Sequence, residues 1–342
     1  MTRRVAVVLL NLGGPDRPEA VRPFLKNVFS DPAIIGLPQP FRSLLASIVS
    51  ARREREARAI YGRIGGASPI LGETLRQARA LEALLAGDEE IHVFVAMRYW
   101  HPMCDEVVRD VLAFRPDRIV LLPLYPQFST STTESSLADW RAKARQVGLT
   151  APTVAVCCFP ALPAFIDAHA ALIRRERARL EGRAHRVLFS AHGLPEKIIA
   201  RGDPYQWQVE RTAAAIVAAL GDVEDSVVCY QSRVGPLKWI GPATADEVRR
   251  AGQNGLAVLL VPIAFVSEHS ETLVELDMTT AELARRVGVP AYIRVPALGA
   301  DAGFVAALAE LARAALGHEG VVAGSGARLC PAGFARCGLA RP

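Results

Sequence analysis

The chain has 342 residues, of which 51% are hydrophobic and 22% are charged, and its formal net charge is +5. This composition is typical of a well-packed globular protein with one large or two ordinary domains. The net charge is mild, and no block of Lys and Arg alternates with aromatic residues. We therefore do not expect a nucleic-acid partner.

The first predicted element is a short apolar run at residues 5–10. It leads directly into residues 11–15 without a cleavage site, which favours a buried strand over a signal peptide. The longest later apolar run, residues 256–266, is too short to span a bilayer. We therefore expect a cytoplasmic protein, in which the six cysteines are thiols or metal ligands rather than disulfides.

Gly13 and Gly14 follow the first strand, where a dinucleotide-binding loop would begin. The G-x-G-x-x-G spacing is absent, and Pro15 lacks an amide that a phosphate would bind. We expect instead a tight strand-to-helix turn, whose backbone a large ligand can approach closely. This disfavours a nucleotide-dependent oxidoreductase.

Residues 32–53 are crowded with apolar side chains and end in Arg52 and Arg53. One interpretation is a buried helix. The other is an apolar lip that grips a hydrophobic ligand and rests on a membrane surface, with arginines for anionic head groups.

Short apolar runs then alternate with amphipathic segments along the chain. Such an alternation predicts parallel sheets covered on both faces, and hence two similar α/β halves at residues 1–150 and 151–317, followed by a tail at 318–342. The predicted strands are 5–10, 91–97, 118–125, 153–158, 186–190, 226–230, 256–263 and 291–295. The predicted helices include 106–114, 164–180, 205–220 and 301–316.

His192 follows the apolar run 187–189, so it is expected at the carboxyl end of a buried strand, where ligands bind in α/β sheets. Further along, Glu268, Glu271 and Glu275 have the i, i+3 and i+7 spacing of one helical stripe. Separately, these features are typical of a structural histidine and a solvated helix face. Together they suit a site that moves protons and captures a divalent cation.

The chain resembles the ferrochelatase family, whose members insert ferrous iron into protoporphyrin. The resemblance rests on motifs in the family's order at residues 11–15, 61–69, 98–102, 122–129, 190–195, 234–239 and 269–277. It implies two Rossmann-like halves around a porphyrin cleft, a lyase of haem biosynthesis, peripheral association with the inner membrane, and a homodimer as one assembly.

The resemblance also assigns the site. His192 would accept the pyrrole protons, with Glu271 opposite it across the ring and Glu275 and Glu268 as the path for Fe²⁺. Leu12, Tyr61, Tyr99 and Trp239 would contact the porphyrin ring, Arg52, Arg53, Tyr61 and Ser68 its propionates, and Arg98 the cleft floor. Glu54 and Glu56 stand among the proposed anion-binding arginines, which is a departure from the expected pattern.

Some family members carry a [2Fe–2S] cluster held partly by a C-terminal tail. Here Cys330 and Cys337 lie in such a tail, and Cys157 with Cys158 would complete four thiolates if the strand bends before Pro160. Thr130 stands in the loop where the animal enzymes place a ligating Cys. The alternative is ordinary reduced thiols, and the remaining cysteines, Cys104 and Cys229, are expected in the core.

Three alternatives to protoporphyrin ferrochelation remain at this point. Coproporphyrin or cobalt would be the substrate of a closely similar chelatase. A non-catalytic tetrapyrrole carrier would have the same cleft, but it would not need His192 and Glu271 together. The oxidoreductase lacks its phosphate loop.

Overall fold

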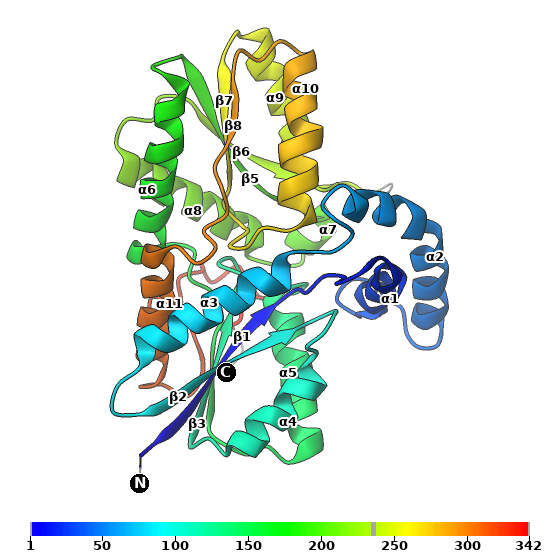
Figure 1. The fold of residues 1–342 in the computed structure, drawn as a ribbon, viewed down its shortest axis with the longest axis vertical. Helices are drawn as coiled ribbons and strands as arrows, with labels where there is room; N and C mark the ends of the chain where they lie inside the picture. Colours follow the sequence, from blue (N-terminus) through cyan, green and yellow to red (C-terminus); the bar gives the residue numbers. More distant parts are fainter. Residues whose placement is uncertain (1, 234–236, 341–342) are drawn as a thin grey trace.

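The computed structural model describes residues 2–233 and 237–340 and contains two parallel sheets, each flanked by helices (Figure 1). The first sheet has the strand order β2-β1-β3-β4-β9, and the second has the order β6-β5-β7-β8. All neighbouring strands run parallel. The predicted fold class, two α/β halves that each contain a parallel sheet flanked by helices, is therefore confirmed.

The strands are apolar without alternation because helices cover both faces of each sheet. In β1, for example, every residue after the first is buried. The strands are β1 (Arg4–Asn11), β2 (Glu90–Met97), β3 (Arg118–Pro123), β4 (Thr153–Val156), β5 (His185–His192), β6 (Ser226–Gln231), β7 (Ala257–Pro262), β8 (Tyr292–Arg294) and β9 (Gly320–Val322). All except β9 were predicted, within a few residues at each end.

The helices occupy the segments between the strands. They are α1 (Val21–Ser30), α2 (Phe41–Gly62), α3 (Ile70–Leu85), α4 (Cys104–Phe114), α5 (Thr133–Val147), α6 (Pro163–Arg177), α7 (Glu196–Ile199), α8 (Tyr205–Leu220), α9 (Thr244–Gln253), α10 (Ala281–Arg286) and α11 (Ala302–Ala315). Short 3₁₀ turns lie at Pro18–Ala20 and Ala178–Leu180, and a π-helix, η3, spans Glu271–Thr280.

The two halves are not consecutive stretches of the chain. Strand β4 pairs with β3, and β9 pairs with β4 through the Val154–Gly320 register, so both belong to the first sheet. Helix α11 also returns to pack against α3 and α6. The predicted division at residue 150 separates β4 and β9 from their own sheet, because the chain crosses between the halves more than once.

One apolar core joins the halves. A contiguous cluster of buried side chains includes Leu9 of β1, Phe304 of α11 and Phe189 of β5. Burial of apolar surface at this junction stabilises the two sheets as a unit, at roughly 25 cal/mol per Å².

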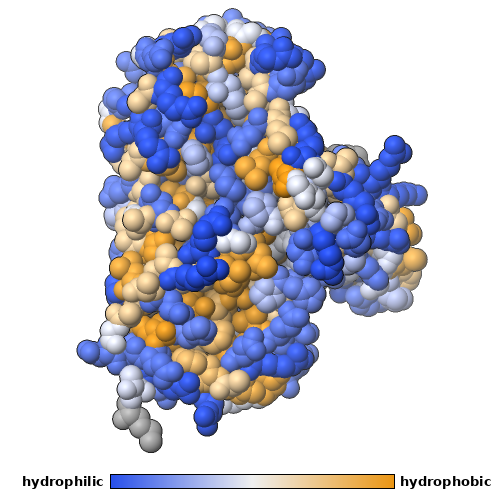
Figure 2. Space-filling view, viewed as in Figure 1, coloured by the Kyte–Doolittle hydropathy of each residue, from blue (hydrophilic) through white to orange (hydrophobic). Residues whose placement is uncertain are grey.

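Helices α1 and α2 pack against each other and project from the side of the molecule (Figure 1). Phe41 and Leu44 of α2 are each 63% exposed, and Ile34, Leu37 and Ile48 are also exposed. Figure 2 shows apolar surface at the outer edge of this projection. The buried-helix interpretation is therefore wrong for these side chains, which we call the lip. Across the described residues, the helices all fall short of the length and apolarity that a membrane span requires.

Candidate active site

His192 is the last residue of β5, with β6 and β7 on either side. Its Nδ1 lies 2.6 Å from the carbonyl oxygen of Gly193. A proton on Nδ1 satisfies that contact and leaves Nε2 with its lone pair free. Nε2 lies 3.8 Å from Oε1 of Glu271. The predicted strand-end position is confirmed, and the geometry provides a proton acceptor facing a carboxylate.

Ser232, just beyond β6, holds the two carboxylates of η3. Its hydroxyl lies within hydrogen-bond distance of both carboxylates, 3.0 Å from Oε2 of Glu271, and its single proton is shared between them, while its backbone N–H donates to Oε1 of Glu275 at 2.8 Å. Its φ is +59°, an unusual conformation for a residue with a side chain. Sequence reasoning missed Ser232, although its place after a parallel strand was a usable signal.

The side chains of Glu275 and His269, which flank Glu271, have pKa values shifted toward their uncharged forms. Burial, together with the charge of Glu271, raises the pKa of Glu275 above its usual value. Burial also lowers the pKa of His269, whose Nε2 lies 4.0 Å from Oε2 of Glu271. His269 therefore places a second imidazole, whose pKa is lowered, beside the same carboxylate, and it too was not predicted as a site residue.

Glu268 does not share the helical stripe that its spacing predicted. It precedes η3, and its Oε1 accepts from Arg294 at 2.6 Å and from the backbone N–H of Ala297 at 2.9 Å. Burial would raise the pKa of Glu268, but the charge of Arg294 and these hydrogen bonds lower it overall. The stripe fails because the wider π-helix begins only at Glu271, and Glu268 is engaged by Arg294.

Two proposed porphyrin contacts lie beside this centre. Tyr61 comes from the first half, yet its hydroxyl lies 3.5 Å from Oγ of Ser270, and burial raises its pKa to about 12. Trp239 packs on the turn after His192. Its ring is so close to Gly193 that a Cβ at that position would lie 3.3 Å from it. Val234, Gly235 and Pro236 of the same motif lie outside the described residues.

The turn after β1 is filled by protein side chains. A Cβ on Gly14 would lie 2.6 Å from Cβ of Ser68, and Gly13, with φ +83°, packs against Trp100. A ligand was expected to approach the backbone of these two glycines closely. In the structure, Ser68 and Trp100 occupy that space instead. Leu12 is partly buried against the cluster that includes Tyr99.

Arg98 and Tyr99 belong to a buried polar network. Arg98 donates to Asp31 and to Ser135, each at 2.8 Å, and the Tyr99 hydroxyl donates to Asp31 at 2.7 Å. Tyr99 is only 2% exposed. In this arrangement both side chains hold Asp31, the residue that follows α1.

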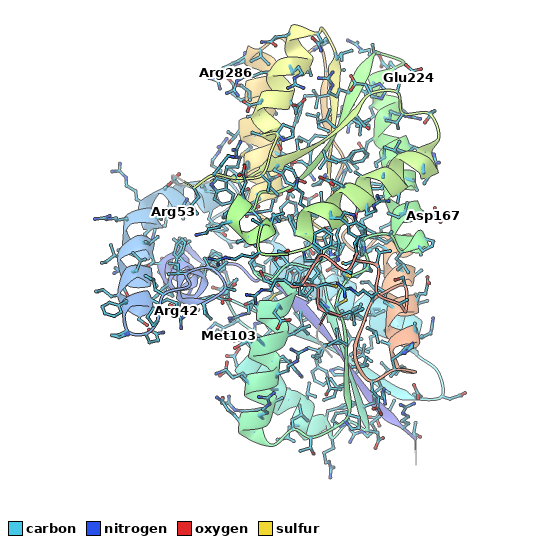
Figure 3. The ribbon with its side chains drawn as sticks, turned by 180° about the vertical axis from the view of Figure 1, so that it is seen from behind. Arg42, Arg53, Met103, Asp167, Glu224 and Arg286 are labelled. Atoms are coloured by element: carbon cyan, nitrogen blue, oxygen red, sulfur yellow. The ribbon has the colours of Figure 1, made fainter. Side chains whose placement is uncertain are left out.

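Arg52 is exposed and Arg53 half-buried, both on the projecting α2, where Figure 3 labels Arg42 and Arg53. The neighbouring Glu54 pairs with Arg58 at 2.9 Å and with Arg22 at 3.9 Å. Glu54 therefore pairs with these arginines rather than with Arg52 or Arg53.

Comparison with known proteins decides the family. The family model for ferrochelatase matches residues 4–316. The chain belongs to the ferrochelatase family. The ferrochelatase of Phenylobacterium zucineum is 55% identical over 339 residues, which cover 98% of this chain and 97% of that protein. The ferrochelatase of Caulobacter vibrioides is 54% identical over 342 residues, or 98% of each chain. Membership of the ferrochelatase family favours neither the carrier nor the oxidoreductase.

Solved structures agree on the fold. The sirohydrochlorin chelatase SirB of Bacillus subtilis subspecies spizizenii, in complex with cobalt, superposes with a TM-score of 0.54 at 9% identity, covering 91% of this chain and 94% of that one. The protein DR2241 of Deinococcus radiodurans, described as similar to chelatases, gives 0.50 at 16% identity, covering 92% of this chain and 55% of that one. This chain and these structures share one fold.

The tail lies beyond the ferrochelatase family match but packs tightly against the molecule. Cys330 and Cys337 are 5% and 4% exposed, and Cys157 and Cys158 are equally buried. Strand β4 ends at Val156, and the sulfurs of Cys157 and Cys158 lie 3.4 Å apart. The predicted bend is thus confirmed, and so is the core placement of Cys104 and Cys229.

The described His, Cys, Asp and Glu side chains are not arranged as a ready metal centre. Within residues 2–233 and 237–340, no three of them surround a common metal position. This includes both the four buried thiols and the carboxylates around His192.

Proposed function

We propose that the protein is a lyase that inserts Fe²⁺ into protoporphyrin to give protoheme, with His192 as the proton acceptor and Glu271 as its partner. The observation that carries the proposal is the 3.8 Å approach of His192 Nε2 to the Glu271 carboxylate, in a chain of the ferrochelatase family. Leu12, Tyr61 and Trp239 form the porphyrin wall in this proposal.

Metallation requires the loss of two pyrrole N–H protons and delivery of a desolvated iron. His192 keeps Nε2 available by engaging Nδ1 with Gly193, so Nε2 takes a pyrrole proton. The carboxylate of Glu271 stabilises the resulting imidazolium, and Glu275, whose pKa is raised, receives a proton readily from the same centre. Carboxylate oxygens hold Fe²⁺ weakly enough to release it, whereas thiolates would hold it more tightly.

The test is anaerobic mixing of the purified protein with Fe²⁺ and either protoporphyrin or coproporphyrin, followed at the Soret band. Faster metallation of protoporphyrin is the expected result. Preference for coproporphyrin, or for Co²⁺ over Fe²⁺, would replace the substrate assignment. Porphyrin binding without metallation would establish the carrier instead.

The lip supports peripheral association with a membrane on the cytoplasmic side. Phe41, Leu44 and Ile48 are exposed at i, i+3 and i+7 of α2, and Arg52 and Arg55 continue the same stripe. An apolar stripe followed by arginines suits the boundary between acyl chains and anionic head groups. Protoporphyrin, which is largely apolar, would reach the site from that side.

A [2Fe–2S] cluster is the further proposal for the tail. Cys157, Cys158, Cys330 and Cys337 provide the four thiolates that such a cluster needs, and all are buried at the same junction. Two observations support the proposal: the four buried thiols themselves, and the side-chain amide of Gln208, whose Nε2 lies 3.0 Å from the Cys330 sulfur and donates to it. A bound cluster would tie the tail to the rest of the protein.

Absorption spectroscopy tests the cluster. Anaerobically purified protein should absorb in the visible range, dithionite should bleach that absorption, and Cys337→Ser should abolish it. Colourless protein with titratable tail thiols would refute the cluster and leave metal insertion unaffected.

A further inference from the structure

The first turn of α8 lies between His192 and the tail. The hydroxyl of Tyr205 donates to the backbone carbonyl of His192 at 3.0 Å. Three residues further along the same helix, Nε2 of Gln208 lies 3.0 Å from the Cys330 sulfur and 3.5 Å from that of Cys158. Residues three apart are neighbours on a helix surface, so one rigid turn contacts both regions.

The tail also contacts the segment that leads into this turn. The backbone N–H of Arg336 donates to the carbonyl of Gly202 at 3.1 Å, and a Cβ on Gly202 would lie 3.0 Å from the backbone nitrogen of Ala335. The rings of Trp207 and Phe334 are 5.8 Å apart. In Figure 3 the tail runs along the junction between the two halves. It therefore supports the start of α8 at several points.

Hydrogen bonds from the first half fix the same turn. Asp203 accepts from the backbone N–H and the hydroxyl of Thr130, at 2.8 and 2.7 Å, and from the N–H of Tyr205 at 3.0 Å. Gln208 accepts from the N–H of Phe128 at 2.7 Å. Asp203 and Gln208 are almost fully buried, so these bonds are shielded from water and define one arrangement.

We propose that Tyr205 is a positioning residue for His192, and that the tail influences metal insertion through Tyr205. The inference rests on the proposed role of His192 as proton acceptor. The carbonyl that Tyr205 holds belongs to the residue whose imidazole must face Glu271, and that residue ends its strand. Loosening the backbone at His192 would misplace its Nε2, and small misplacements of a reacting group reduce reaction rates strongly.

The first test is Tyr205→Phe, with Tyr230→Phe as the matched control. Tyr230 is equally buried, and its hydroxyl has no hydrogen-bond partner among the described residues. Loss of one hydrogen bond predicts a kcat lower by about 3- to 10-fold for Tyr205→Phe, with KM for protoporphyrin unchanged. Hydrogen exchange of residues 190–194 should also become faster. The control should match the wild type, and a Tyr205→Phe variant that also matched it would overturn the proposal.

The second test asks whether the tail acts through Tyr205. Phe334→Ala, or Phe334→Leu if the first variant folds poorly, should lower kcat and speed exchange in residues 190–194. Leu329→Ala, at an exposed tail position, is the control. In a Tyr205→Phe background the Phe334 change should have little further effect on kcat, because the two act on one contact.

Additive losses in the double variant would refute the coupling. A wild-type protein that does not metallate porphyrin would instead refute the proposed function, and the exchange measurement would still decide whether Tyr205 and the tail order residues 190–194.

Discussion

At the scale of single residues, His192 has a free Nε2 because its Nδ1 is engaged by Gly193. His192→Ala removes the proton acceptor, so kcat should fall by about 10² to 10⁴ while porphyrin binding persists. Glu271→Gln should cause a comparable loss, since an amide neither accepts the proton nor neutralises Fe²⁺. Stopped-flow metallation and porphyrin fluorescence quenching measure the two properties separately. Wild-type turnover in His192→Ala would rule out the assignment.

Glu275 makes stability at this site depend on pH. Burial and Glu271 raise its pKa above the usual 4.5, so above that pH the unfolded chain holds fewer protons than the folded one. Stability therefore falls as pH rises through the raised pKa. Glu275→Gln cannot ionise, so its Tm should exceed that of the wild type at pH 7, and the difference should shrink toward pH 4. A Tm difference independent of pH would contradict this account.

His169 is buried in α6, and neither ring nitrogen has a hydrogen-bond partner among the described residues. Burial lowers its pKa from 6.5 to about 3, so between these values only the unfolded chain is protonated, and stability falls as pH falls. At pH 5 the loss is about 2 kcal/mol. His169→Leu should remove it, which urea unfolding at pH 7 and pH 5 would reveal. Equal pH dependence in both proteins would show that another group titrates.

At the scale of elements, the lip should govern membrane binding. Phe41→Asp with Leu44→Asp places two charges where apolar side chains are most exposed, so the variant should dissociate from anionic liposomes and its KM for protoporphyrin should rise. Leu112→Asp is the matched control, because Leu112 is an exposed apolar residue on α4. Flotation assays measure the difference. Equal flotation of all three proteins would mean that the lip does not bind the membrane.

Elements with a long, consistent pattern were predictable from the sequence. The strands of four or more residues and helix α8 follow from apolar runs and helical periodicity, as does the position of His192. Strands β8 and β9 have three residues each, but β8 lies within the predicted apolar segment 291–295, whereas β9 consists of one glycine and two valines and was not predicted. The π-helix has the same residue types as an α-helix, so the sequence did not indicate that its turn widens and begins after Glu268. Ser232 reaches Glu271 through tertiary packing, which local sequence does not encode. His269 lies only two residues from Glu271, within the motif at residues 269–277, but its contact with the Glu271 carboxylate depends on how the chain enters the π-helix.

At the scale of the whole molecule, the common core predicts that both halves unfold together. Far-UV circular dichroism reports both sheets, and in a Trp207→Phe, Trp239→Phe variant the fluorescence comes from Trp100 and Trp140 of the first half. Urea transitions from the two measurements should coincide. Two separate midpoints would instead show that the halves are independent domains.

Because β9 pairs with β4, the first sheet is completed only late in synthesis of the chain. Residues 153–156 form an edge of the first sheet early, but their partner strand, Gly320–Val322, is translated more than 160 residues later. At about 5–20 residues per second, the interval is on the order of ten to thirty seconds. During that time the growing chain exposes an unpaired strand edge next to Cys157 and Cys158. A nascent chain of this protein therefore needs protection from aggregation and oxidation until residues 320–322 are made.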